Sequence, residues 1–292
     1  MHKADDFAPS FFVVGPPRTG TTWLQDILRH HAILPSPTKE TRFFDVHFHR
    51  GFEWYRAHFP QKTAGRPAGE IAPTYFASNE ACERISRMVP QARVVCIFRN
   101  PVERVISLYR VKRAYGMVPW EFKDALFHDP ELLETSKYIS KLNLWRDAMG
   151  SDQVLATIYD DLRDKPQSYV DRLADFIGIP RFHLNPSQQK AMHGSETLTH
   201  PWSYLCTHHA TRIAERFKAH RLDRLLALVR DSHLKRLFLS SGPPFDPIAE
   251  ELKTDLYELF RPDVEQLEVV LNRDLSTWKA ATMKRQLASR AL

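Results

Sequence analysis

The chain has 292 residues, of which 43% are hydrophobic and 26% charged. These proportions exclude a disordered or fibrous protein, and the length suits one large α/β domain, or less simply two small ones. Lysine and arginine number 41 against 35 aspartate and glutamate, so the net charge is +6. That excess favours anionic ligands but is too modest to indicate a nucleic-acid-binding protein.

Membrane and disulfide signals are both weak. No apolar run approaches the ~20 residues of a membrane span, and the N-terminus lacks the basic-then-apolar order of a signal peptide. The three cysteines, Cys82, Cys96 and Cys206, are too scattered for a disulfide framework or a metal cluster. We therefore expect a soluble, cytoplasmic protein, the alternative being a lumenal domain of a longer chain.

Strand-loop-helix units recur along the first part of the chain. Apolar, β-rich runs predict strands at residues 11–15, 93–99 and 154–159, and helical patterns follow over residues 21–31, 101–115 and 169–177. Strands that alternate with helices imply a parallel sheet covered on both faces.

Strand signals disappear from about Thr207 onward. Regularly spaced apolar residues there predict helices, broken around Pro243-Pro244 and Pro262. The predicted fold class is therefore α/β, a P-loop-like three-layer domain with a central parallel sheet and a helical C-terminal third. We expect a single domain over residues 1–292, divided into an α/β core at 1–180 and a mainly helical part at 181–292.

The first strand and helix flank a glycine-containing loop. Residues 15–22, GPPRTGTT, have the G-x-x-x-x-G spacing of a nucleotide-binding loop. Backbone N–H groups and the helix dipole would hold an anion there. The alternative is that the glycines only turn the chain and Arg18 is a surface charge.

This loop lacks the lysine of an ATPase. Thr21 stands where that lysine would follow the second glycine, and the loop's cation is Arg18. A kinase or ATPase also needs a strand-end aspartate for magnesium, but the second strand ends in Arg99-Asn100. The loop is thus suited to binding a phosphate without the apparatus for cleaving a triphosphate, and we expect no metal.

A second basic element follows the middle strand. Ser107 lies eight residues after Arg99, about two turns along a helix that starts at Pro101. Arginine and hydroxyl could share a further phosphate; the alternative is a capping or surface arrangement.

Together these elements resemble the sulfotransferases that use 3′-phosphoadenosine-5′-phosphosulfate (PAPS), in particular bacterial and Golgi types. PRTGTTWL is similar to their 5′-phosphosulfate loop, and CIFRNPVERVISLY is similar to their 3′-phosphate motif. Residues 159–162 and 176–180 resemble the family's middle section, so the likeness covers about residues 10–180. LNRDLSTW, at 271–278, is similar to a late element of bacterial members.

The resemblance implies roles for particular residues. Arg99 and Ser107 would hold the 3′-phosphate. The 5′-phosphosulfate would be held by Arg18, Thr19, Gly20, Thr21, Thr22 and Trp23. Cytosolic and heparan-type members have lysine at the position of Arg18. Because arginine does not readily give up a proton, Arg18 would stabilise charge rather than act as an acid.

The resemblance also implies a general base. KETRFFD, at residues 39–45, is similar to the segment in which Golgi-type members place a catalytic glutamate, so Glu40 is the candidate that removes the proton of the acceptor hydroxyl. The alternatives are a surface glutamate paired with Lys39 or Arg42, or a base supplied by His47 or His49.

Two other family segments match less well. EIAPTYF, from Glu70, resembles a segment in which a basic residue approaches the sulfuryl donor, but Ile71 and Ala72 are apolar. Glu70 and Tyr75 would instead shape the acceptor cleft or fix the second strand. No segment between Lys190 and His200 matches the loop that closes over the adenine.

The predicted activity is sulfuryl transfer from PAPS to a hydroxyl acceptor. A glycan acceptor is expected, since sugar-stacking and hydrogen-bonding residues follow the base motif: His47, His49, Arg50, Trp54, Tyr55 and Arg56. These aromatics could equally belong to the core, and a lipid-linked acceptor could use the same surface. The rival functions are a nucleotide kinase or NTPase with an altered loop, and a non-catalytic anion- or glycan-binding module.

Overall fold

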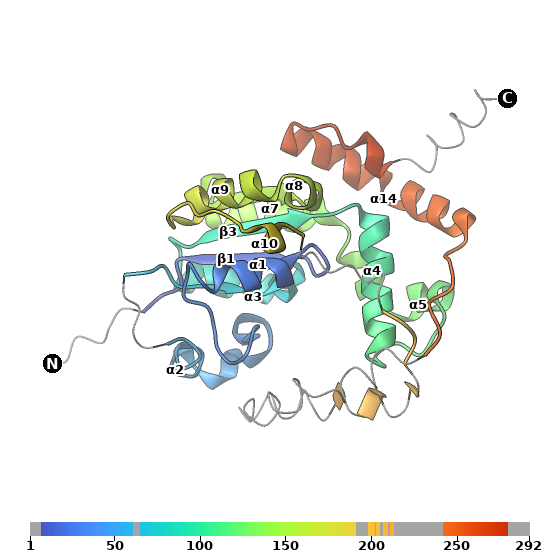
Figure 1. Cartoon of the computed structure of the whole chain (residues 1–292), viewed down its shortest axis with the longest axis horizontal. Helices are drawn as coiled ribbons and strands as arrows, with labels where there is room; N and C mark the ends of the chain where they lie inside the picture. Colours follow the sequence, from blue (N-terminus) through green and yellow to red (C-terminus); the bar gives the residue numbers. More distant parts are fainter. Residues whose placement is uncertain are drawn as a thin grey trace. The chain divides into compact units, whose positions relative to one another are not determined.

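The computed structural model describes residues 7–60, 65–190 and 242–279, together with 198–201, 203–204, 207–209 and 211–212 (Figure 1). The chain divides into two compact units that are interleaved in sequence. The first unit comprises Met1–Arg99 and Ser140–His193, and the second comprises Asn100–Ile139 and Gly194–Leu292. The single domain with a division at residue 180 stays a prediction.

The first unit contains a four-stranded, wholly parallel sheet in the order β2-β1-β3-β4. Its strands are β1 (Phe11–Gly15), β2 (Gly69–Ile71), β3 (Arg93–Phe98) and β4 (Val154–Ile158). The three predicted strands and their parallel pairing are confirmed. The structure adds β2 as a short strand beside β1.

Helices cover both faces of this sheet. Because side chains alternate along a strand, Phe11 and Val13 of β1 point into one layer with α1 (Thr21–Leu28), α8 (Tyr159–Asp164) and α9 (Pro166–Ile177). The opposite layer contains α3 (Asn79–Met88) and α7 (Tyr138–Met149), where Trp145 donates to the carbonyl of Phe76 and the Phe76 ring packs edge-on against Phe98. The three-layer α/β class is thereby confirmed.

Short helices complete the first unit: the π-helix η1 (Phe43–His47), the 3-10 helices η2 (Phe48–Arg50), η3 (Pro73–Ala77) and η4 (Ser151–Gln153), and the α-helices α2 (Phe52–Arg56) and α10 (Pro186–Lys190). Helix α1 ends at Leu28, before the predicted residue 31. The chain leaves the helix there because Ile33 forms a parallel bridge with Ala68 next to the sheet.

The second unit is helical in its described residues. It contains α4 (Pro101–Ala114), α5 (Phe122–His128), α6 (Glu131–Glu134), α14 (Glu250–Leu271) and the 3-10 helix η6 (Ser276–Trp278). Helix α4 begins as predicted at Pro101, and the Asn100 side chain caps it by accepting from the backbone N–H groups of Val102 and Glu103. The predicted helices within residues 213–241 lie outside the described residues.

The predicted helix break at Pro262 is wrong, since α14 runs through this proline. Proline removes one hydrogen bond to the preceding turn. That loss is offset by a continuous apolar face, on which Leu256, Phe260, Val264 and Leu267 are buried. Over the described residues, no helix combines the length and the apolar character needed to cross a membrane.

Candidate active site

The loop after β1 requires glycine at both ends. Gly15 has φ +92°, and a β-carbon there would lie 2.6 Å from the β-carbon of Pro73. Gly20 has φ +89°, and a β-carbon there would lie 3.3 Å from the ring of Tyr159. Both positions therefore exclude larger residues.

Between the two glycines, a side-chain hydrogen bond within the loop stabilises its conformation. The hydroxyl of buried Thr19 donates to the carbonyl of Pro16 at 2.8 Å. Arg18 has φ +76°, a conformation that non-glycine residues rarely adopt. Helix α1 begins directly after Gly20 without a side-chain cap. Its first N–H groups therefore have no partner within the helix, as an anion-binding helix start requires.

Lys39 adds a cation to this helix start. Its Nζ donates to the hydroxyl of Thr22 at 3.2 Å and lies 3.6 Å from Oε1 of Glu40. Burial lowers the pKa of Lys39, as does the positive charge of Arg18, whereas the carboxylate of Glu40 opposes that shift. A lysine from a later segment therefore lies at the start of α1, although the loop sequence contains none. In the sequence, the position of Lys39 next to Glu40 in the KETRFFD motif was the signal that could have identified it as a site residue.

Glu40 lies at the edge of this arrangement. Its side chain is 26% exposed, and it forms the predicted pair with Lys39. Because Lys39 also bonds to Thr22, that pairing brings Glu40 toward the phosphate loop. The pairing of Glu40 with Lys39 is thus compatible both with a catalytic glutamate and with a surface glutamate.

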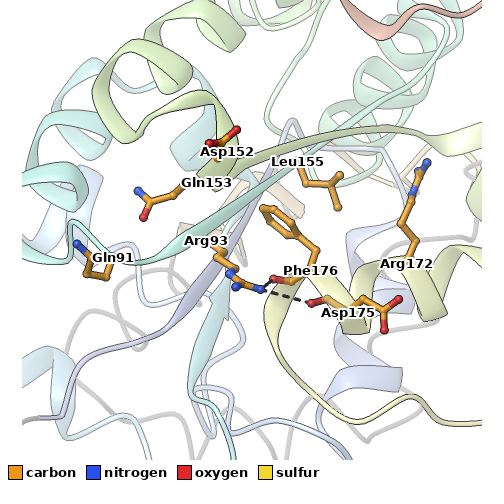
Figure 2. A pocket seen from close by; sticks show the side chains of 8 residues that line it. All are labelled: Gln91, Arg93, Asp152, Gln153, Leu155, Arg172, Asp175 and Phe176. Atoms are coloured by element: carbon orange, nitrogen blue, oxygen red, sulfur yellow. Dashed lines mark hydrogen bonds between the residues drawn. The ribbon is translucent and has the colours of Figure 1, made fainter.

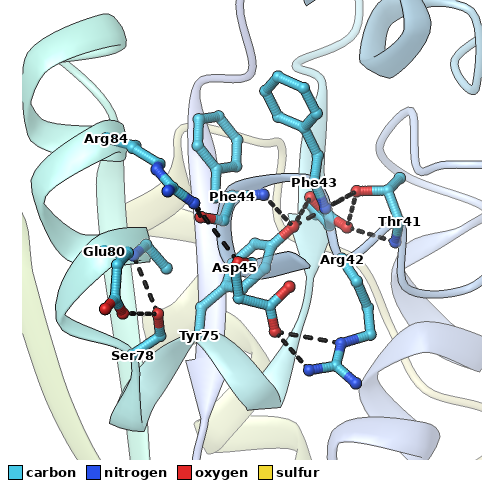
Figure 3. A network of polar contacts seen from close by, with 11 residues as sticks. Thr41, Arg42, Phe43, Phe44, Asp45, Tyr75, Ser78, Glu80 and Arg84 are labelled. Atoms are coloured by element: carbon cyan, nitrogen blue, oxygen red, sulfur yellow. Dashed lines mark hydrogen bonds and ion pairs between the residues drawn. The ribbon is translucent and has the colours of Figure 1, made fainter. Parts of the chain in front are cut away.

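Glu70 and Tyr75 lie behind the Glu40 segment rather than in a cleft, and both are fully buried. Oε1 of Glu70 accepts from the backbone N–H of Thr41 at 2.7 Å and from its hydroxyl at 2.8 Å, while Oε2 accepts from the Tyr75 hydroxyl at 3.1 Å. We call Thr41, Phe44, Glu70 and Tyr75 the Glu70 network. Figure 3 shows how Thr41, Phe44 and Tyr75 converge in it.

Hydrogen bonds within this network reach the backbone on both sides of η1's start. The N–H of Phe44 donates to the Tyr75 hydroxyl at 3.3 Å. Burial raises the pKa of Glu70 to about 7, although the hydrogen bonds from Thr41 and Tyr75 act to lower it. Complete burial is inconsistent with direct contact between Glu70 and an acceptor, and its hydrogen bonds instead connect β2 to Thr41 and Tyr75.

Arg99 approaches the phosphate loop within the first unit. Its guanidinium lies over the Tyr159 ring, 4.8 Å from the centroid, and Nη1 is 3.5 Å from the carbonyl oxygen of Arg18. Tyr159 thus supports both Arg99 and Gly20, a role that the sequence interpretation missed. Ser107 is buried on α4 in the second unit, so its pairing with Arg99 stays a prediction.

Trp23 has a different position from the one its motif suggests. Its indole N–H donates to the carbonyl of Gln188 at 2.8 Å, and its ring belongs to the core cluster beside Leu24 and Ile27. Trp23 therefore anchors α1 to the segment around α10, and its indole N–H is already bonded.

The aromatic segment after Glu40 divides into core and surface. Tyr55 is fully buried, with its ring 4.9 Å from that of Phe43, so the expected sugar contact by Tyr55 is wrong. Trp54 remains partly exposed, with Arg50 over its ring at 5.3 Å and His47 at 5.4 Å. Burial lowers the pKa of His47, and the charge of Arg50 adds to the effect.

A polar hollow lies elsewhere in the first unit. Its volume is about 620 Å³, and it is lined by residues that include Arg93, Asp152 and Arg172 (Figure 2). Arg93 begins β3 and donates to the carbonyls of Asp175 and Phe176. Ligands of parallel α/β sheets bind at the carboxyl ends of strands, so this hollow at the opposite ends is not the candidate site. Within the described ranges, no group of three or more histidine, cysteine, aspartate or glutamate side chains could hold a metal.

A parallel sheet and a glycine-bounded loop at a helix N-terminus define a phosphate-binding α/β protein of the P-loop-like class. The model of the sulfotransferase domain family matches residues 8–216, well over half of the chain. The chain therefore belongs to the sulfotransferase domain family.

Curated relatives come from larger proteins. The bifunctional heparan sulfate N-deacetylase/N-sulfotransferase 2 of Bos taurus is 29% identical over 203 residues, which are 62% of this chain and 23% of the relative. The heparan sulfate glucosamine 3-O-sulfotransferase 3B1 of Mus musculus is 29% identical over 182 residues, 59% of this chain and 47% of the relative. The chain thus matches between about a quarter and a half of these relatives' length.

Among solved structures, a sulfotransferase from Alicyclobacillus acidocaldarius has a TM-score of 0.67 and 19% sequence identity. The match covers 94% of this chain and 99% of the other. At 19% sequence identity, this similarity supports the assignment of the fold alone.

Proposed function

We propose that the protein transfers a sulfuryl group from PAPS to a hydroxyl group of a glycan acceptor. The observation that carries this proposal is the contact between Lys39 and Thr22, in which a cation that is paired with Glu40 bonds to the first turn of α1. Family membership supplies the reaction class. In this proposal the start of α1 would hold the phosphosulfate, and Glu40 would be the carboxylate beside it.

In the proposed reaction, the acceptor oxygen attacks sulfur as Glu40 takes its proton. The bond between sulfur and the bridging oxygen breaks, and its electron pair leaves on the 5′-phosphate of 3′-phosphoadenosine-5′-phosphate (PAP). A positioned base contributes typically 10²–10⁴-fold to such a step. Arg18, Lys39 and the N–H groups at the start of α1 would stabilise the negative charge on the leaving phosphate.

Binding of PAPS is proposed to use two groups of residues. Thr19, Gly20, Thr21 and Thr22 would surround the 5′-phosphosulfate with Arg18, while Trp23 would act by holding α1 in place. Arg99 and Ser107 would bind the 3′-phosphate. The support for Arg99 is its position beside the carbonyl of Arg18, stacked on Tyr159.

A glycan acceptor is proposed because two lines of support agree. The curated relatives are named for heparan sulfate substrates. Beyond Glu40, the partly exposed ring of Trp54 lies beside His47 and Arg50, and such aromatic and polar side chains can stack on sugar rings and bond their hydroxyls.

An acceptor screen with radiolabelled PAPS tests the proposed function. Heparan sulfate oligosaccharides, glycolipids and simple phenols would be compared at saturating PAPS, and we expect the highest kcat/KM for an oligosaccharide. A phenol with a far higher kcat/KM than every carbohydrate would overturn the glycan acceptor, since this ratio measures discrimination between substrates. Binding of PAP without transfer to any acceptor would favour a non-catalytic module.

We also propose a cytoplasmic location. Its support is that Cys82 and Cys96 are free thiols in the interior of the first unit. Burial raises the pKa of Cys82 to about 11, so its thiol is protonated at neutral pH and reacts slowly. Fractionation of cells that produce the protein, followed by immunoblotting, tests the location directly. Recovery in a membrane-enclosed compartment would contradict it.

A further inference from the structure

We propose that Glu70 is a positioning residue for the reaction: its buried carboxylate holds Thr41 against the sheet and thereby places the adjacent Glu40 at the phosphate loop. This inference rests on the proposed role of Glu40 as general base. It concerns how the base is aimed, because Glu70 itself is fully buried and reaches no substrate.

The contact between Glu70 and Thr41 is double. One carboxylate oxygen accepts from both the backbone N–H and the hydroxyl of Thr41, at 2.7 and 2.8 Å. The Thr41 hydroxyl also accepts from the N–H of Phe43 at 3.1 Å. Three hydrogen bonds therefore fix both the position and the orientation of the backbone immediately after Glu40, whereas a single bond would allow it to rotate.

The backbone of Glu70 is part of the parallel sheet. Glu70 lies on β2 opposite Phe12 of β1 in a parallel pair. Strand β1 continues to Gly15, where the phosphate loop begins. A continuous set of hydrogen bonds thus connects the strand that presents the phosphate loop with the segment that presents Glu40.

Glu40 is therefore constrained from both sides. On one side, Lys39 bonds to Thr22 in the first turn of α1. On the other side, Thr41 bonds to Glu70. The two neighbours of Glu40 in sequence thus contact α1 and β2, which fixes the backbone on both sides of Glu40.

A purely structural role is a poor account of a carboxylate at this place. Burial of an ionised group is costly unless it is paired, and no lysine or arginine among the described residues forms an ion pair with Glu70. An apolar side chain of similar size would avoid that cost. What an apolar side chain lacks is an acceptor for the two donors of Thr41 and for the Tyr75 hydroxyl.

Two substitutions separate position from charge. Glu70→Asp keeps the carboxylate but withdraws it by one methylene, so Thr41 must move or lose its bonds. Glu70→Gln removes the charge but keeps an oxygen at the right distance, and its NH₂ can donate to the Tyr75 hydroxyl. We expect Glu70→Asp to lower kcat about 10–100-fold, as a shift on the order of 1 Å can, and Glu70→Gln to lower it by no more than about threefold.

Each substitution is also made in a Glu40→Gln background. If Glu70 acts through Glu40, then Glu70→Asp should cause little further loss once the base is gone, which gives a strongly non-additive double-mutant cycle. PAP affinity should stay within about twofold of wild type in Glu70→Asp, because the phosphate loop is intact. Thr157→Val is the matched control, since it removes another buried hydroxyl, bonded to Cys96 and Tyr169 in the same sheet.

The rates are measured as PAP release from PAPS with the best acceptor of the screen, or with water as acceptor if none turns over. The positioning role would be overturned if Glu70→Gln lost as much activity as Glu70→Asp. It would also be overturned if Glu70→Asp lowered the rate by the same factor in wild type and in the Glu40→Gln background. If Glu40→Gln alone keeps full activity, the proposed base fails and the inference fails with it. If Glu70→Asp does not fold, Thr41→Val enters the same cycle, with the same expected non-additivity.

Discussion

The Lys39 ammonium donates to the hydroxyl of Thr22, the second residue of helix α1, at 3.2 Å. A cation at this point lies where the helix dipole already favours negative charge. The pKa of Lys39 is lowered by burial. The site therefore combines a permanently charged arginine in the loop with a lysine whose proton is held less tightly.

Replacement of Lys39 by methionine should lower kcat/KM for PAPS about 10–100-fold, the range for loss of one charge-assisted hydrogen bond. Because this cation is assigned to the charge on the leaving phosphate, kcat should fall more than PAP affinity. Steady-state kinetics and PAP calorimetry measure the two effects. Lys137→Met, which removes an exposed partner of Glu134, is the control, and equal losses in kcat and PAP affinity would indicate simple anion binding.

Replacement of Glu40 by glutamine should leave PAP binding unchanged and lower kcat about 10²–10⁴-fold, because the acceptor hydroxyl loses its general base. The measurement is kcat at saturating PAPS and acceptor, with PAP titration as the check on folding. Glu53→Gln, at a more exposed position, serves as control. Full activity of the Glu40 variant would assign the base to His47, His49 or another group.

Arg99 and Arg93 form a natural pair for testing the 3′-phosphate assignment, since they follow and begin the same strand, β3. Arg99→Ala should weaken PAP binding by about 1.5–3 kcal/mol, through loss of a charge-assisted contact. Arg93→Ala, which removes contacts to Asp175 and Phe176 at the other end of the sheet, should not. Calorimetric titration with PAP measures both affinities. Equal affinities of the two variants would contradict the assignment of Arg99 to the 3′-phosphate site.

Stability should depend on pH through Glu70. Since burial raises the pKa of this group to about 7, the folded protein keeps a proton that the unfolded chain releases above about pH 4.5. Its contribution to stability is therefore present at low pH and is lost as pH rises through about 7. The Glu70→Gln variant cannot ionise at this position. The difference between its free energy of unfolding and that of wild type should therefore increase, in favour of the variant, by up to about 3 kcal/mol from pH 5 to pH 8.

Thermal melts of wild type, Glu70→Gln and the exposed control Glu53→Gln over this pH range measure that difference. The Tm of Glu70→Gln relative to wild type should rise between pH 5 and pH 8, while that of the control should not. A difference that is independent of pH would show that Glu70 keeps the same protonation state in the folded and unfolded chain.

Sulfuryl transfer should continue in excess chelator, because strand β3 is followed by Arg99-Asn100 rather than by the aspartate with which an NTPase holds magnesium. Radiolabel transfer from PAPS with and without chelator is the measurement. Activity that is lost in chelator and restored by magnesium would favour the nucleotide kinase alternative.

Local patterns were enough to predict three of the four strands and the positions of the glycines in the loop after β1. Strands β1, β3 and β4 are continuous apolar runs, and a buried parallel strand requires that composition at nearly every position. The loop was equally readable, since Gly15 and Gly20 adopt positive φ angles that the chain cannot reach easily with other residues. Where the pattern failed, at Pro262, distant packing along α14 outweighed a local preference.

The polar contacts of the site could not be read in the same way. Thr41 meets Glu70, which the sheet holds on β2 beside β1, and Lys39 meets Thr22 in a helix 17 residues earlier in the chain. The sequence left open whether Tyr55 lies at the surface or in the core, and the structure buries it against Phe43. Composition and spacing report the preferences of neighbouring residues, whereas these contacts join segments whose proximity depends on how the whole unit packs.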